Sequence, residues 1–75
     1  MKTDYEFINM VKIKDLPKTT VWHVLNKKSG DPIGVIRWNP GWRQYCFFPY
    51  DLTVFSAGCL NDIVAFIADL KAGAL

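Results

Sequence analysis

Arginine and aromatic side chains alternate closely in the middle of the chain. Guanidinium groups bind phosphates or guanine edges, and aromatic rings stack on bases or pack against sugars. With two nearby lysines, such side chains form a candidate nucleic-acid surface of seven residues: Lys27, Lys28, Arg37, Trp38, Trp42, Arg43 and Tyr45. The alternative interpretation, which we favour, is that the rings belong to the core and the arginines lie over them.

Residues suited to catalysis are few and scattered. Cys59 stands near the expected start of a helix, where the helix dipole favours a thiolate, and His23 is the only candidate base. Because no third group is marked to orient them, we interpret Cys59 as a small packed thiol. Asp62 and Asp69 are seven residues apart and share roughly one helix face, where we expect a solvated surface. The sequence predicts no catalytic residue and no enzyme.

The sequence also predicts no cofactor and no metal. It has neither a Gly-x-Gly-x-x-Gly motif nor a Walker-type loop, so nothing indicates a backbone cradle for nucleotide phosphates. One histidine and two cysteines, Cys46 and Cys59, without a Cys-x-x-Cys pair exclude a structural zinc site. We expect both cysteines to be reduced thiols.

Three strands and one helix are expected to position these side chains. Residues 20–25, 33–38 and 42–48 are rich in β-branched and aromatic residues, and turn residues around Gly30 and Pro40 separate them. Connections this short predict an antiparallel meander. Residues 52–55 fit either an extension of the third strand or a short fourth one. Ser56 is a plausible helix cap, and apolar residues then recur at helical spacing up to Leu70.

The predicted fold class is therefore α+β, as one domain over residues 1–75. An N-terminal arm or strand covers residues 1–19, the β-meander residues 20–55 and the C-terminal amphipathic helix residues 56–72. Residues 6–14 fit a strand, an arm or a helical turn equally well. Pro17 ends this segment.

Strand alternation assigns the side chains to two sheet faces. A hairpin centred on Gly30 is expected to pair Trp22 with Trp38 and His23 with Arg37. One face then carries Trp22, Val24, Ile36 and Trp38, and the other carries Val21, His23, Leu25, Val35 and Arg37. The register of the third strand stays open, because a slip of one residue swaps its faces. Both faces are apolar, so we expect the N-terminal arm, a second copy of the chain or another partner to cover the face that the single helix leaves free.

Length and composition fit one small globular domain. The chain has 75 residues, 51% of them hydrophobic, and a net charge of +2, which is far from the composition of disordered chains. It has no apolar run long enough to span a membrane and no recognisable signal peptide, so we expect a cytoplasmic protein without membrane partners. Residues 21–50 hold four basic residues and one acidic one, whereas residues 51–75 hold one basic residue and three acidic ones. The sheet is therefore expected to be basic and the helix acidic.

Several short runs resemble one group of proteins. They are Val21–Val24, Ser29–Gly30, Gly34–Trp38, Trp42–Pro49, Thr53–Phe55 and Cys59–Ile63. This pattern looks like that of short uncharacterised bacterial and phage-associated proteins, which implies a compact stand-alone domain without an assigned activity. The order of three strands and a helix is also similar to DNA-binding domains of the AP2 type and of integrase N-termini. That looser likeness implies a sheet that enters the major groove.

The sequence thus favours a non-enzymatic binding module, self-associating or protein-binding through the sheet face that the helix does not cover. The alternative is a DNA-binding accessory protein of the phage or mobile-element type, which would use the seven basic and aromatic residues named above. No small-molecule substrate is indicated.

Overall fold

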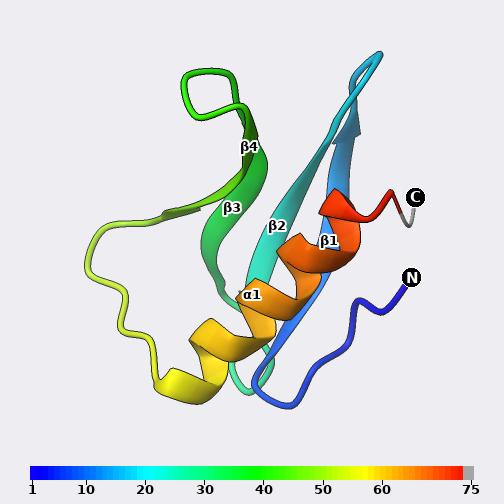
Figure 1. Ribbon diagram of the computed structural model, residues 1–75. Coiled ribbons are helices and arrows are strands. Elements are labelled where there is room, and N and C mark those ends of the chain that lie inside the picture. Colours follow the sequence, from blue (N-terminus) through cyan, green and yellow to red (C-terminus); the bar gives the residue numbers. More distant parts are fainter. Residues whose placement is uncertain (74–75) are drawn as a thin grey trace.

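One antiparallel sheet and one helix make up the fold. The computed structural model describes residues 1–73, in the order β1 (Ile8–Asp15), β2 (Thr20–Asn26), β3 (Pro32–Asn39), β4 (Gln44–Pro49) and α1 (Ala57–Lys71). The four strands are neighbours in sequence order, and α1 lies across one face of the sheet (Figure 1). In the part of the chain that the structure describes, no helix is long and apolar enough to cross a membrane.

The sheet has four strands, so the prediction of three was wrong. The additional strand is β1, which comes from the segment expected to be an arm or a strand, and it pairs antiparallel with β2 from Ile8 opposite Asn26 to Asp15 opposite Thr20. Its alternation places Ile8 and Met10 in the core, and this burial favours the strand over a helical turn. Residues 50–56 form neither an extension of β4 nor a further strand; they connect β4 to α1.

The β2–β3 hairpin has the expected faces in a different register. Trp22 pairs with Ile36 and His23 with Val35, two residues away from the predicted partners. A shift of two residues preserves every side-chain direction because the strand period is two. Trp22, Val24 and Ile36 therefore share one face as predicted, and the structure shows that this face is the buried one.

The core lies between the sheet and α1. Phe66 from the helix is fully buried, with its ring centroid 4.9 Å from that of Trp22 and 6.5 Å from that of Tyr5, both in edge-to-face geometry. The other buried hydrophobic side chains are Ile8, Met10, Val24, Ile36, Ile63 and Leu70. Ser56 caps the helix as expected, since its hydroxyl accepts a hydrogen bond from the backbone N–H of Cys59 at 3.2 Å.

Candidate functional site

The sheet face turned away from α1 is the first candidate surface. Pairing aligns Val11, His23, Val35 and Phe48 in one row across all four strands. The neighbours of this row on the same face include Val21, Leu25, Arg37 and Cys46. We call these eight residues the open sheet face. Within residues 1–73 no segment covers it, because the expected arm is the edge strand β1 of the same sheet (Figure 1).

Two side-chain pairs order the polar groups on this surface. The guanidinium carbon of Arg37 lies 3.8 Å from the ring centroid of Phe48, a cation–π contact. A hydrogen bond of 2.9 Å joins His23 Nε2 to the hydroxyl of Tyr50, just beyond β4. The only cation among the eight residues is thus held against a ring. Lys14, which pairs with Val21, and Asn9, which pairs with Leu25, add polar groups at the edge strand β1.

A pocket on the other side of the sheet is the second candidate. It has a volume of about 370 Å³ and lies between the β3–β4 hairpin and the last turns of α1. Its lining residues are Trp38, Trp42, Arg43, Gln44, Tyr45, Ile67, Leu70 and Lys71. We call it the Trp42 pocket. It joins four of the seven predicted binding residues to helix residues that sequence reasoning missed.

The turn between β3 and β4 forms the rim of the pocket. The side-chain oxygen of Asn39 accepts a hydrogen bond from the N–H of Gly41 at 2.9 Å, and its carbonyl accepts bonds from Trp42 and Arg43 at 3.2 and 2.7 Å. Arg43 has a φ of 55°, in the left-handed region that side chains rarely adopt. The turn leaves the Trp42 side chain 70% exposed.

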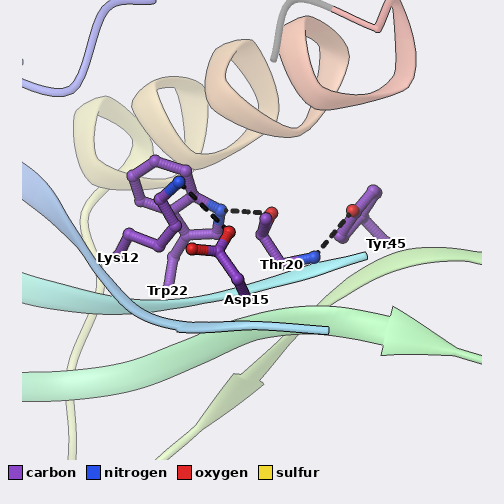
Figure 2. Close-up of polar contacts among 5 residues, drawn as sticks. All are labelled: Lys12, Asp15, Thr20, Trp22 and Tyr45. Carbon is purple, nitrogen blue, oxygen red and sulfur yellow. Dashed lines mark hydrogen bonds and ion pairs between the residues drawn. The ribbon is translucent and has the colours of Figure 1, made fainter. Parts of the chain in front are cut away.

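Tyr45 forms a wall of the pocket that is attached to the core. Its hydroxyl accepts a hydrogen bond from the backbone N–H of Thr20 at 3.2 Å, and Trp22 Nε1 donates to the hydroxyl of the same threonine at 2.8 Å (Figure 2). The Tyr45 ring meets that of Trp38 edge to face, with centroids 5.5 Å apart. These contacts fix the Tyr45 ring, so this wall is preformed.

The charges around α1 are divided between its two sides. Among residues 1–73, those that line the pocket include two cations, Arg43 and Lys71, and no carboxylate. On the side of the N-terminal segment, burial raises the pKa of Tyr5, and the charges of Asp69 and Asp62 raise it further. Asp62 also accepts a hydrogen bond from the N–H of Phe7 at 3.3 Å. The carboxylates of Asp62 and Asp69 therefore interact with the N-terminal segment.

The seven predicted binding residues lie in three places. Trp38, Trp42, Arg43 and Tyr45 meet at the Trp42 pocket, whereas Arg37 belongs to the open sheet face. Lys27 and Lys28 lie in the β2–β3 turn, at the opposite end of the sheet from the β3–β4 turn. Lys27 donates to the carbonyl of Tyr5 at 2.8 Å and forms an ion pair with Asp4 at 3.0 Å. The basic side chains thus do not share one surface.

The open register of the third strand is now defined. Tyr45 pairs with Trp38 and lies on the face that α1 covers, while Phe48 pairs with Val35 on the open sheet face. The helix residues Ile67, Leu70 and Lys71 could not be assigned to a site from local pattern. Their sequence signals were the apolar helical repeat for Ile67 and Leu70 and a cation in the last helical turn for Lys71.

Cys59 and His23 do not meet. Cys59 packs against the core on the helix side and accepts a hydrogen bond from the Ser56 hydroxyl at 3.3 Å, whereas His23 points to the open sheet face. Both cysteines are free thiols. Among residues 1–73, no group of three or more His, Cys, Asp or Glu side chains is placed to hold a metal ion.

The fold and these surfaces define a small α+β domain with a four-stranded antiparallel meander and one C-terminal helix. The chain is 35% identical over 66 residues to an uncharacterised 9.3 kDa protein of Acholeplasma phage L2, and the match covers 87% of this chain and 85% of the phage protein. The chain belongs to the same family as this phage protein, in agreement with the expected phage association. No family model matches the chain. No solved structure matches it either.

Proposed function

We propose that this protein is a non-enzymatic binding module that self-associates by packing the open sheet faces of two copies together. The observation that carries the proposal is the row Val11, His23, Val35 and Phe48, which crosses all four strands with no segment of residues 1–73 above it. Antiparallel sheets usually place one apolar face on a core and turn a polar face to water. Here the second face also carries apolar side chains, namely Val11, Val21, Leu25, Val35 and Phe48, and these fit a partner.

The size of the surface supports an interface. Four strands about 4.8 Å apart and about seven residues long span a surface of roughly 19 by 23 Å. Continuous apolar patches of a few hundred Å² are typical of interaction sites, whereas single exposed apolar residues are not.

A second copy is the partner that fits best. Among residues 1–73, nine hydrophobic side chains are buried, which is a small core. Chains of this length gain stability from oligomerisation when one core supplies too little. Two regular sheet faces pack on each other about 10 Å apart with their side chains interdigitated, and the two helices would then lie on the outside.

The test is light scattering after size exclusion, over a range of protein concentrations. We expect the wild type to form a dimer and Val35→Glu to be a monomer, because the new charge would be buried at the centre of the interface. Val64→Glu is the matched control, since Val64 is 65% exposed on the outer side of α1 and should leave the dimer intact. A wild type that is monomeric at every concentration would contradict the proposal.

Cysteine labelling gives a second measurement on the same proteins. Cys46 belongs to the open sheet face and Cys59 does not. A maleimide should therefore label Cys46 more slowly in the wild-type dimer than in Val35→Glu, while the rate at Cys59 stays the same. Equal rates at Cys46 in both proteins would contradict an interface on this face.

DNA binding is a second candidate function, favoured by the gathering of Trp38, Trp42, Arg43 and Tyr45 at one pocket. It is tested with a labelled random duplex at low and moderate salt. Binding through phosphate contacts should weaken steeply as salt rises, and Arg43→Ala should reduce it. Binding that is absent or insensitive to salt would rule this candidate out.

A further inference from the structure

We infer that the Trp42 pocket binds a nucleobase that carries a phosphate, either as a free mononucleotide or as one unit of a single strand. This inference goes beyond self-association, because the pocket and the open sheet face lie on opposite sides of the sheet. It rests on the second candidate function, DNA binding, only in that both take a nucleic-acid ligand. It names an unpaired base as the group that is recognised.

The exposed rings supply surfaces for stacking. Trp42 is 70% exposed and Trp38 is 39% exposed, whereas Trp22 in the core is only 5% exposed. Our favoured interpretation of the sequence had assigned these rings to the core. The exposure of Trp38 and Trp42 shows that packing in the core does not account for them. A base stacks on such rings whatever its identity, because every base presents a π face. In a duplex this face is covered by the neighbouring pairs, so a stacking pocket selects unpaired bases.

The charges of the pocket select an anion. Arg43 and Lys71 both line it, and none of its eight lining residues is acidic. The C-terminal end of α1 contributes about half a negative charge, which these two full positive charges exceed. A phosphate attached to the stacked base is the group that this charge distribution attracts.

The size and rigidity of the pocket fit one nucleotide. A volume of about 370 Å³ lies at the lower end of the range for small-ligand pockets. The Tyr45 wall is fixed by Thr20, and the rim is fixed by the three hydrogen bonds to Asn39. A preformed site of this kind loses little conformational entropy on binding.

The test measures the binding of a fluorescein-labelled ten-residue oligothymidine by fluorescence anisotropy, with unlabelled dTMP as competitor. We expect saturable binding by the wild type. Trp42→Ala should weaken it by about 5- to 150-fold, the range measured for the loss of one stacked base. Arg43→Gly and Lys71→Ala each remove one cation, so each should weaken binding and reduce its salt dependence. With both cations present, two phosphate contacts correspond to about a 7-fold loss of affinity between 50 and 200 mM salt.

The control is Lys28→Ala, which removes an equal charge at the far end of the sheet and should leave the affinity unchanged. Circular dichroism checks that each variant is folded. If Trp42→Ala does not fold, Arg43→Gly serves as the pocket variant. Competition by dTMP identifies a free mononucleotide as a sufficient ligand. Strong oligothymidine binding without competition by dTMP identifies the single strand as the ligand.

Three results would overturn the inference. They are no saturable binding of the labelled oligothymidine, an equal loss of affinity in Lys28→Ala and Arg43→Gly, and binding that Trp42→Ala leaves unchanged. Duplex binding without oligothymidine binding would reject the inference while leaving the DNA-binding candidate in place. Light scattering on the same variants reports self-association separately.

Discussion

The open sheet face and the Trp42 pocket are built in opposite ways. The open sheet face repeats one simple pattern, in which every second residue of each strand points outward and neighbouring strands align these residues in rows. The Trp42 pocket combines a tight turn, two strands and the end of a helix that follows more than twenty residues later. The regular surface suits an equally regular partner, and the concave one suits a small ligand. Two surfaces on opposite sides of one sheet can be occupied at the same time.

The largest expected effect breaks both regions at once. Phe66 is fully buried between α1 and the sheet, so Phe66→Ala should lower the free energy of unfolding by about 3–5 kcal/mol. Urea denaturation followed by circular dichroism measures this loss. Val64→Ala, at an exposed position of the same helix, should cost far less. Similar losses in the two variants would show that the helix does not pack as described.

The next effect separates the pocket from the open sheet face. In Thr20→Val the indole N–H of buried Trp22 loses its partner, which should cost about 1–3 kcal/mol in the free energy of unfolding. The dimer should persist, because Thr20 lies on the helix side of the sheet (Figure 2). Thr53→Val removes an exposed hydroxyl bond in the β4–α1 connection and should cost less. Dissociation of the Thr20→Val dimer in a folded protein would contradict the independence of the two regions.

A smaller effect distinguishes the conformation of Arg43 from its charge. At a φ of 55°, glycine is relaxed and alanine is not, so Arg43→Gly should be more stable to urea than Arg43→Ala by about 1 kcal/mol. Both variants remove the same cation and should lose ligand affinity alike. At Lys28, which does not have a positive φ, alanine should be at least as stable as glycine. The same order of stabilities at both positions would contradict the described turn.

The smallest effect tests the division of charge by α1. Burial, Asp69 and Asp62 raise the pKa of Tyr5, so the folded protein keeps its proton at pH values where the unfolded chain releases it. The stability that this proton contributes is present below the ordinary tyrosine pKa of about 10 and is lost as the pH rises through the folded-state pKa. Above pH 10, the free energy of unfolding should therefore fall more steeply in the wild type than in Tyr5→Phe. Parallel slopes from neutral to alkaline pH would contradict this account.

Local pattern was sufficient for the elements whose residues repeat with a clear period. The helix after Ser56 and the shared sheet face of Trp22, Val24 and Ile36 were predicted correctly, because burial on one side imposes a period that is visible within each segment. The hairpin was predicted with the wrong partners for Trp22 and His23. The register depends on the geometry of the turn and on an irregularity between Val24 and Leu25, neither of which the period reveals.

The first strand shows where such reasoning stops. Residues 6–14 are equally compatible with a strand and a helical turn, and the choice depends on what lies beside them. Pairing with β2 and burial of Ile8 and Met10 under α1 decide it. The same decision removes the arm as a cover for the open sheet face.

The sequence by itself therefore determined the α+β class, the helix and which residues of β2 and β3 share a face, since these follow from periodicity along the chain. Only the tertiary structure decided that a fourth strand joins the sheet, that Tyr45 lies under α1, and that Arg43 and Lys71 line one pocket. The physical reason is that pairing partners and pockets depend on contacts between distant segments, and the free energy of such contacts is not encoded in the pattern of either segment alone.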